Sequence, residues 1–348
     1  MQATSGRLYK LGAELGSGAY GTVYSATRDD GKHFAFKKFE SSVDLELGAL
    51  REISILRILK NSPNSYGLMK MEDFVSIENK EPTIGIIMKL YKMDLYDAFK
   101  KKILDKKVYN SIALTLLEAV AFLHENGIIH RDIKPENILL DENFNPVLTD
   151  FTLSKVFTGL CASGTHTGKI ATVTYRAPEV VEKKPYGFPA DIWSLGVVFY
   201  ELFSEKQLTA EKDKEVLAFF AKQIPSFKKG KIGNIVRGLL AFDPKERWTA
   251  KKALKSELLG KSSYVSKQIW KPLTKYNVRK EIEDMCENFE AEKKISKIAA
   301  QVYVDQTGCS VHSAVELACK FYETDPISLE GAEEEMMILK KMEYNLFI

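Results

Sequence analysis

The spacing of hydrophobic residues changes along the chain. Residues 8–40 contain short strand-like runs separated by glycine-rich turns, with the hairpin signal Asp29-Asp-Gly between two of them. Strand signals return at 72–77 and 84–88. Between these parts, residues 44–60 repeat apolar side chains every three or four positions, which is the period of an amphipathic helix. The front of the chain is therefore predicted to form a sheet with one helix.

From about residue 95 the helical period dominates. It is clearest over 112–124 and 191–203, and two further helices are predicted within 231–259. The exception is the loop-rich stretch 128–180. A strand-rich front followed by a helical back predicts an α+β fold with two lobes and a cleft between them.

Composition narrows the class of protein. The chain has 348 residues, 45% of them hydrophobic, so a sizeable globular core is expected. A net charge of +3 is too small to indicate nucleic-acid binding by bulk electrostatics. The four cysteines show no Cys-x-x-Cys spacing, which argues against a structural zinc site and against a disulfide framework.

The apolar runs of the chain bear on its location. The first seven residues lack the apolar segment of a secretory signal. No run approaches the ~20 apolar residues that are needed to span a bilayer. We therefore expect an intracellular protein, in the cytoplasm or the nucleus, that has no membrane partner.

The stretch from 130 to 152 carries the strongest chemical signal. Asp132, Lys134 and Asn137 lie on one short loop, and Asp150 follows thirteen residues after Asn137. Such a loop aspartate can orient a hydroxyl nucleophile, while an asparagine and a second carboxylate can hold Mg²⁺ on a nucleoside triphosphate. An ordinary polar loop does not explain the whole set. Asn137 and Asp150 are therefore the candidate metal ligands.

A glycine-rich turn and a lysine point to the same chemistry. Gly16-Ser-Gly18-Ala-Tyr-Gly21-Thr-Val23 stands between two predicted strands, and its glycines allow the backbone to approach phosphates. Dinucleotide-binding folds use this pattern too, but here a strand follows rather than a helix. Lys37 lies on a later strand, where it can pair with nucleotide phosphates, and Glu52 of the predicted 44–60 helix is its candidate counter-charge.

Together these motifs resemble the eukaryotic-type protein kinases over residues 8–258. They follow the order of the family, which continues with Ala177-Pro-Glu179, Asp191 and Arg247. The resemblance implies a bilobal fold that binds ATP and Mg²⁺ in the cleft. It implies that Asp132 accepts the proton of the substrate hydroxyl. Lys134 is similar to the lysine of the serine/threonine branch, which reaches the transferred phosphoryl group.

The resemblance also implies which residues contact the nucleotide. The set is Leu15, Gly16, Ser17, Gly18, Ala19, Tyr20, Gly21, Val23, Ala35, Lys37, Met88, Leu90, Tyr91, Asp94 and Leu139. In this set Met88 matches the gatekeeper before the hinge, Asp94 would lie by the ribose, and Leu139 would form an apolar floor under the adenine ring. For the apolar members, ordinary core packing is the alternative interpretation.

The 44–60 helix narrows the resemblance to the cyclin-dependent kinases. Its run Ala49-Leu-Arg-Glu-Ile-Ser-Ile-Leu is similar to the cyclin-binding helix of that family. Arg51, Arg131 and Lys155 stand where those kinases carry three arginines that bind a phosphothreonine. Lysine at the third position keeps the charge but lacks the bidentate geometry of arginine.

The same resemblance implies regulatory modification sites. Counting back without gaps from Tyr175 places Thr167 at the phosphoacceptor position, and Thr165 and Ser163 are close rivals. In the glycine-rich turn, Tyr20 matches the inhibitory tyrosine of the family.

Three departures from the family pattern matter. Thr152 replaces the glycine of Asp-Phe-Gly, and because threonine is β-branched we expect less freedom for that segment to flip. Thr174 replaces a tryptophan that is common in cyclin-dependent kinases. Residues 204–230 are too short for most of the insert that is typical of that group. The last two departures leave proline-directed substrate choice open.

Residues 276–348 follow a predicted linker at 259–275 and carry several helical stripes. They resemble the N-terminal part of a cyclin box, and Lys320 and Glu335 match the cyclin pair that contacts the kinase. The tryptophan expected in the first helix is absent, and only one box is present. A helical unit of this size is marginal alone, so we expect it to pack on the 44–60 helix in cis. There are two alternatives. The tail is a helical extension that only stabilises the fold, or the kinase recruits an external cyclin.

The sequence thus predicts a serine/threonine kinase of cyclin-dependent type, with a short extension at 1–7, that transfers the γ-phosphoryl group of Mg-ATP to protein substrates. The alternative is a pseudokinase or scaffold in which Thr152 marks lost activity. The residues that argue against this alternative are Lys37, Glu52, Asp132, Asn137 and Asp150.

Overall fold

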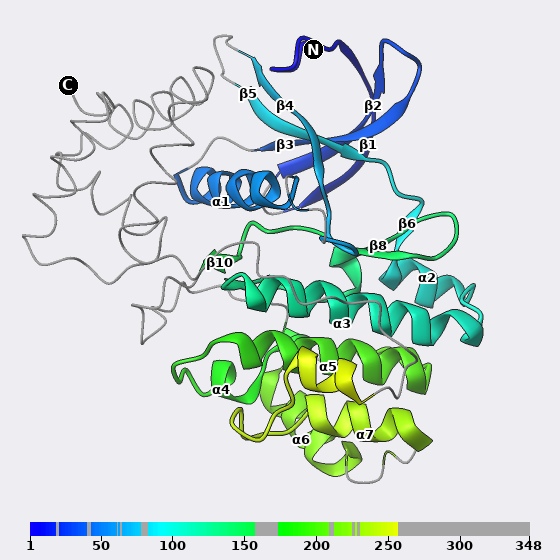
Figure 1. Cartoon of the computed structure of the whole chain (residues 1–348), viewed down its shortest axis with the longest axis vertical. Coiled ribbons are helices and arrows are strands. Elements are labelled where there is room, and N and C mark those ends of the chain that lie inside the picture. Colours follow the sequence, from blue (N-terminus) through cyan, green and yellow to red (C-terminus); the bar gives the residue numbers. More distant parts are fainter. Residues whose placement is uncertain are drawn as a thin grey trace, which may run out of the picture.

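The structure is a computed structural model that describes residues 1–18, 21–39, 43–60, 62, 65–77, 83–156, 173–208, 212–224, 227 and 230–256. Within these residues a sheet forms one end of the molecule and helices form the other (Figure 1). The predicted order of a strand-rich front and a helical back is confirmed for this part of the chain. The predicted linker and cyclin-like domain lie outside the described residues.

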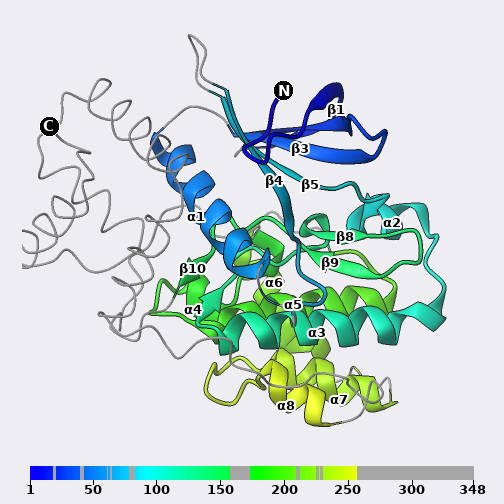
Figure 2. The ribbon, with the colours of Figure 1, turned by 45° about the horizontal axis from the view of Figure 1, so that its top comes forward.

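The N-terminal lobe is an antiparallel sheet with the strand order β1-β2-β3-β5-β4. Its strands are β1 Tyr9–Gly18, β2 Gly21–Arg28, β3 His33–Phe39, β4 Met71–Ile77 and β5 Thr83–Lys89. Helix α1, Val43–Lys60, lies beside this sheet (Figures 1 and 2). Ile55, Leu56 and Leu59 of this helix are at most 2% exposed, so they lie on its buried side.

Residues 1–8 extend the edge of the sheet. Ala3 forms an antiparallel bridge with Val75 of β4, and the Thr4 N–H donates to the Phe74 carbonyl at 2.8 Å. The segment thus pairs with a strand that comes more than sixty residues later in the chain. It covers an edge that would otherwise leave backbone groups of β4 unpaired.

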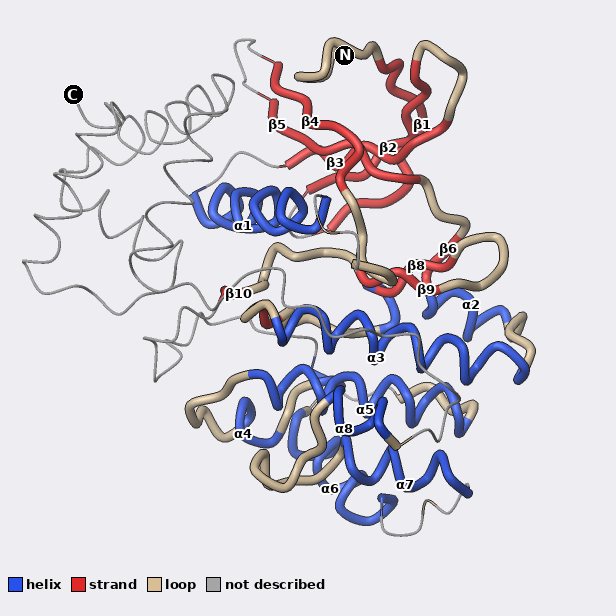
Figure 3. Tube along the Cα trace, in the orientation of Figure 1, coloured by secondary structure: helices blue, strands red, loops and turns tan. Residues whose placement is uncertain are grey.

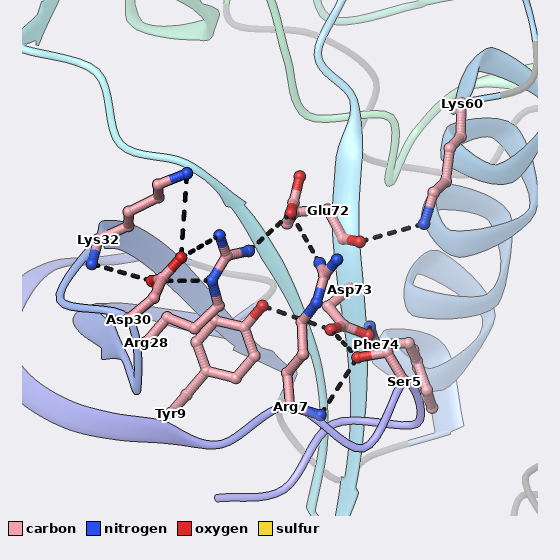
Figure 4. A network of polar contacts seen from close by, with 10 residues as sticks. All are labelled: Ser5, Arg7, Tyr9, Arg28, Asp30, Lys32, Lys60, Glu72, Asp73 and Phe74. Carbon is pink, nitrogen blue, oxygen red and sulfur yellow. Dashed lines mark hydrogen bonds and ion pairs between the residues drawn. The ribbon is translucent and has the colours of Figure 1, made fainter.

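Side chains reinforce this attachment. The Ser5 hydroxyl donates to Oδ2 of Asp73, and the Tyr9 hydroxyl donates to the same oxygen at 3.3 Å (Figure 4). Asp73 is only 4% exposed, so these hydrogen bonds satisfy a buried carboxylate.

A cluster of ion pairs flanks the buried carboxylate. Arg7 and Arg28 each place an Nη1 atom 2.9 Å from Oε1 of Glu72 (Figure 4). Because Arg7 and Glu72 are well exposed, we expect this cluster to contribute less to stability than the buried hydrogen bonds beside it.

The C-terminal lobe is helical. Its helices are α2 Leu95–Lys101, α3 Tyr109–Glu125, α4 Pro178–Val181, α5 Phe188–Ser204, α6 Asp213–Gln223, α7 Gly230–Leu239 and α8 Ala250–Lys255, with 3₁₀ turns η1 Lys106–Val108, η2 Pro135–Asn137 and η3 Val173–Tyr175. Residues 190–203 of α5 are all buried, which identifies α5 as the central helix of this lobe. The four helices predicted from periodicity for this lobe correspond to α3, α5, α7 and α8.

Short strands connect the two lobes, and all of them except β6 lie in the stretch 128–180 that is predicted to be rich in loops. They are β6 Met93–Asp94, β7 Ile128–Ile129, β8 Ile138–Leu140, β9 Pro146–Leu148 and β10 Lys155–Val156. β6, β8 and β9 form one small sheet, which lies between the large sheet and the helices, and β7 pairs with β10 (Figure 3). These pairings fix both ends of the segments that carry the predicted chemistry.

One hydrophobic cluster runs through both lobes. It includes Leu56 of α1, Ile86 of β5, Leu116 of α3 and Trp193 of α5, all completely buried. Phe151 belongs to the same cluster and is also completely buried. Helix α1 and the segment that follows β9 therefore share one continuous core. In the part of the chain described above, no helix combines the length and the hydrophobicity of a membrane span.

Candidate active site

The loop at 130–137 is held in place by a carboxylate of helix α5. The Asp191 carboxylate accepts the backbone N–H groups of His130 and Arg131, both at 2.8 Å, and lies 2.9 Å from Nε2 of His124. Burial would raise the pKa of Asp191, but these hydrogen bonds and the nearby imidazoles lower it, so the carboxylate is ionised. Arg131 has a φ of 72°, which most residues avoid, so the loop needs this support.

His130 fixes the same loop through both ring nitrogens. Burial lowers its pKa, so the imidazole is neutral near pH 7. Nε2 lies 3.0 Å from the Thr149 carbonyl and Nδ1 lies 3.3 Å from the Asp132 backbone nitrogen. Nε2 must therefore donate and Nδ1 must accept, which selects one tautomer. This ring links the residues before Asp150 to Asp132.

Asp132 is oriented by two residues of its own loop. Its Oδ2 accepts from Nζ of Lys134 at 3.0 Å and from Nδ2 of Asn137 at 2.8 Å. The Asn137 amide also donates to the Asp132 carbonyl at 2.8 Å. Both amide hydrogens of Asn137 are thereby engaged, which leaves its amide oxygen for a metal ion. Burial would lower the pKa of Lys134, but Asp132 raises it, so the lysine is charged.

Lys37, Glu52 and Asp150 meet from three separate elements. Nζ of Lys37 on β3 lies 2.6 Å from Oε2 of Glu52 on α1 and 3.1 Å from Oδ1 of Asp150 after β9. Burial would lower the pKa of Lys37, but the two carboxylates raise it. Burial would raise the pKa of Asp150, but Lys37 and a hydrogen bond from Thr152 lower it to about 2. The predicted ion pair of Lys37 and Glu52 is therefore assembled, with α1 turned toward the sheet.

Thr152 makes a contact that the sequence interpretation missed. Its hydroxyl donates to Oδ1 of Asp150 at 2.7 Å. Sequence reasoning considered only the effect of a β-branched residue on the backbone, yet the residue with a positive φ here is Asp150, at 65°. A hydroxyl two residues after an aspartate can close a local turn, and that spacing is the signal that was available.

The donor set fits a magnesium ion. Asp150 contributes a carboxylate whose side chain is 24% exposed, and Asn137 contributes an amide oxygen. Mg²⁺ prefers oxygen ligands and is commonly bound by one or two protein oxygens together with substrate phosphates and water. The two residues predicted as metal ligands thus have the chemistry that the ion requires.

The register of the large sheet brings predicted nucleotide contacts together. Gly16 pairs with Val23, and Val23 pairs with Lys37 on the next strand. Ala35 pairs with Met88 of β5. Cross-strand partners lie about 5 Å apart, so these residues form a continuous surface on the sheet.

Glycines at the end of β1 and the start of β2 have two different roles. A Cβ atom on Gly16 or Gly18 would meet nothing within 4 Å, so both positions are open. Gly21 has a φ of 143°, and a Cβ atom there would lie 2.2 Å from the Lys38 carbonyl oxygen. Gly21 is therefore required by the backbone of the sheet itself. Ala19 and Tyr20, between these glycines, lie outside the described residues.

The predicted adenine and ribose contacts occupy the junction of the lobes. Leu90 and Leu15 are 36% and 52% exposed, whereas Met88 is 6% exposed and belongs to the core. Asp94 pairs with Leu139 in the small sheet. The Asp94 carboxylate also accepts the Asp97 N–H at 2.7 Å as the N-cap of α2, and burial raises its pKa. Core packing thus applies to Met88, and Asp94 has a structural role.

The predicted phosphothreonine site is only partly visible. Arg131 is 4% exposed and belongs to the loop at 130–137. Arg51 and Lys155 lie on α1 and β10, but their side chains are outside the described part of the structure. Thr167 lies outside the described residues as well. The grouping of these three cations stays a prediction.

The end of the loop-rich stretch is anchored to the helical lobe. Arg247 binds both carboxylate oxygens of Glu179, at 2.6 and 3.0 Å, and this pair is buried. The Tyr175 hydroxyl donates to Glu201 of α5 at 3.0 Å. Glu201 also accepts the Leu208 N–H at 2.7 Å. These contacts hold the residues that follow the predicted phosphoacceptor.

Comparisons with known proteins agree with this geometry. Residues 9–259, most of the chain, match the protein kinase domain family. The chain is 33% identical over 231 residues to cyclin-dependent kinase 4 of Xenopus laevis, which covers 63% of this chain and 71% of that protein. It is 33% identical over 212 residues to cyclin-dependent kinase 4 of Mus musculus, which covers 58% and 69%. The chain therefore belongs to the protein kinase family, with cyclin-dependent kinases among its relatives.

Proposed function

We propose that this protein is a serine/threonine kinase that transfers the γ-phosphoryl group of Mg-ATP to hydroxyl groups of protein substrates. The observation that carries the proposal is a pair of carboxylate sites, one in the loop at 130–137 and one directly after β9. Asp132 lies with Lys134 and Asn137, and Asp150 lies with Lys37 and Glu52. Each site has the charge pattern that one part of phosphoryl transfer requires.

Asp132 serves the incoming hydroxyl. Its Oδ2 is fixed by Lys134 and Asn137, so the carboxylate has a defined orientation before substrate binds. We assign to it the role of accepting the hydroxyl proton. The ammonium group of Lys134, 3.0 Å from this carboxylate, is suited to neutralise charge on the transferred group.

Asn137 and Asp150 would hold the magnesium ion, and Lys37 would bind the nucleotide phosphates. Bound Mg²⁺ would neutralise the charge that develops on the phosphate oxygens during transfer. Lys37 is kept charged and in place by Glu52, so α1 must be in the observed position for the site to be complete. The open positions at Gly16 and Gly18 are suited to close approach of phosphates.

Phosphotransfer by the purified full chain tests this proposal. We expect Mg²⁺-dependent transfer from labelled ATP to generic protein substrates, with the label on serine and threonine. The matched control is Asp132→Asn, which keeps the shape of the side chain. Absence of transfer by the wild type, alone or with an added cyclin, would favour the scaffold instead. Label on tyrosine alone would contradict the substrate class.

We further infer that the kinase is of the cyclin-dependent type and that residues 276–348 bind α1 in cis, after a kinase domain at 8–258 and a linker at 259–275. The supporting observations are the buried Glu52 on α1, paired with Lys37, and the relatives named as cyclin-dependent kinases. A tethered domain acts at an effective concentration of roughly millimolar.

Removal of residues 262–348 tests the inference about the tail. Loss of activity is expected if the tail acts in cis, whereas intact basal activity would indicate recruitment of an outside partner. The double change Lys320→Glu with Glu335→Lys is a sharper variant. Full activity of that folded protein would refute the cyclin-like contact. Thr167→Ala, compared with Thr165→Ala and Ser163→Ala, tests the proposed phosphoacceptor.

A further inference from the structure

We propose that Thr152 is a positioning residue for the metal-binding carboxylate. In this inference, which rests on the proposed function, the Thr152 hydroxyl holds the Asp150 side chain in the orientation that receives magnesium. The glycine that the kinase pattern has at this place carries no side chain that could do so. The substitution would then support metal binding rather than mark lost activity.

Hydrogen bonds to Asp150 converge on one oxygen. Oδ1 lies 2.7 Å from the Thr152 hydroxyl, 3.4 Å from the Thr152 backbone nitrogen and 3.1 Å from Nζ of Lys37. All three contacts are made by Oδ1, and among the described residues no contact to Oδ2 is seen. With Oδ1 occupied three times, rotation of the carboxylate would break all three contacts. Oδ2 is therefore held in one place, on a side chain that is 24% exposed.

The Thr152 hydroxyl is itself confined. Thr152 is 1% exposed, so a hydroxyl without a partner at this position would be costly, and the Asp150 oxygen supplies that partner. Its β-branched side chain has few rotamers, which adds to the restriction. The contact is thus a hydrogen bond to a charged group in a buried setting, which is the strongest kind.

The backbone around this contact is fixed as well. The Ser154 N–H donates to the Phe151 carbonyl at 3.0 Å, and the Ser154 hydroxyl donates to the His130 carbonyl at 3.1 Å. Phe151 is completely buried, with its ring 5.1 Å from that of His130. The segment 150–154 is therefore joined to the Asp132 loop, and Thr152 adds the link to the carboxylate itself.

Asp150 has a left-handed backbone conformation, which needs support from surrounding contacts. A φ of 65° is unfavourable for most residues, and such strain persists only where surrounding contacts outweigh it. The bond from Thr152 restrains the side chain of the residue that adopts this conformation. Without it, we expect Asp150 to sample other orientations, so that binding of magnesium would require the side chain to be ordered first.

A purely structural role for Thr152 makes different predictions. If the residue only fills space, Thr152→Val should preserve function, because valine has the same shape. If the hydroxyl is what matters, Thr152→Ser should preserve function and valine should not. Thr115→Val in α3, at a buried threonine that is 7% exposed, controls for the general effect of this substitution.

The experiment measures binding of a fluorescent ATP analogue to the full chain during titration with Mg²⁺. We expect the wild type, Thr152→Ser and Thr115→Val to share one Mg²⁺ midpoint. Thr152→Val should need roughly tenfold more Mg²⁺, with its Mg²⁺-free nucleotide affinity unchanged. Thermal melting checks that each variant is folded, and Thr152→Ala replaces the valine variant if that protein fails to fold.

Three outcomes overturn the inference. A Mg²⁺ midpoint of Thr152→Val equal to that of the wild type shows that the hydroxyl has no such role. If the Mg²⁺ midpoint of Thr152→Ser is raised as far as that of Thr152→Val, the packing of the threonine methyl group is responsible and not the hydroxyl. A wild type that binds nucleotide without any response to Mg²⁺ contradicts the proposed function itself, and this result is distinguishable because it does not involve Thr152.

Discussion

The two carboxylate sites of this protein are built in opposite ways. Asp132 is oriented by Lys134 and Asn137, which lie two and five residues away on the same loop. Asp150 has one local partner, Thr152, but its charged partner is Lys37, which is 113 residues away and is itself paired with Glu52 of α1. The side-chain partners of Asp132 lie within one short loop, which α5 braces through its backbone, whereas the contacts of Asp150 with Lys37 and Glu52 exist only while three elements are packed together. Control of α1 would therefore act on Asp150 and leave Asp132 in place.

The largest expected effects separate the roles of the two sites. Asp132→Asn should lower phosphoryl transfer by about 10²–10⁴-fold and leave Mg²⁺-dependent binding of ATP unchanged. Asp150→Asn should abolish transfer and also remove the Mg²⁺ dependence of nucleotide binding, because a magnesium ligand is lost. Transfer assays and nucleotide titrations on both proteins check this. Equal nucleotide affinity of the two variants would remove the distinction between the sites.

The local site should depend on its brace in α5. The backbone N–H groups of His130 and Arg131 donate to different oxygens of Asp191, so in Asp191→Asn the amide NH₂ would replace one acceptor and face one of these N–H groups. We expect the free energy of unfolding to fall by about 3 kcal/mol, since hydrogen bonds to a charged group are lost. Urea unfolding measures this. Asp213→Asn, which removes a partly exposed ion pair with Arg176, should change it by less than about 1 kcal/mol.

Glu201 of α5 is a buried carboxylate that lies outside both sites, and its pKa shifts in the opposite direction from that of Asp150. Burial raises the pKa of Glu201 to about 7, against the lowering effect of hydrogen bonds from Leu208 and Tyr175. The raised value stabilises the fold fully below pH 4.5, and this contribution is lost as the pH rises to about 7. The loss amounts to about 3 kcal/mol over that window.

Glu201→Gln should remove this pH dependence. The free energy of unfolding of the variant should change less than that of the wild type between pH 4.5 and 7.5. At the upper end of this range the variant should be the more stable protein. Chemical unfolding at several pH values measures the difference. Parallel curves for the two proteins would show that Glu201 ionises at the same pH in the folded and the unfolded chain.

The smallest expected effect concerns the attachment of residues 1–8, which is also built over a long range. Tyr9→Phe deletes one hydrogen bond to the buried Asp73 and should lower the free energy of unfolding by about 1 kcal/mol. Tyr66→Phe is the matched control, because Tyr66 is 62% exposed. Unfolding curves that coincide for all three proteins would show that the bond contributes nothing to stability.

The same division explains what the sequence could predict. The Asp132 site could be predicted because Asp132 and its partners lie within the eight-residue loop 130–137 and each has one evident chemical role. Glu52 was found because helical periodicity and motif order placed it opposite Lys37. Both are inferences from local pattern, and the observed contacts agree with the predicted placement of these residues.

Other contacts depend on register and rotamer, which local pattern does not fix. Ser5 and Asp73 are 68 residues apart, and nothing in either segment indicates that they meet. The short strands β8 and β9 lie in the stretch predicted to be loop, because three-residue pairings are too short to show a periodic pattern. The Thr152 hydroxyl was overlooked because threonine was judged by its backbone preference and not by what its side chain could donate.

Calorimetric titration of the full chain with ATP tests the central claim most directly. The account predicts binding in the presence of Mg²⁺ that weakens markedly when the metal is chelated, and that disappears in a Lys37→Met, Asp150→Asn double variant. No heat of binding for ATP at saturating Mg²⁺, from a protein shown to be folded, would contradict it.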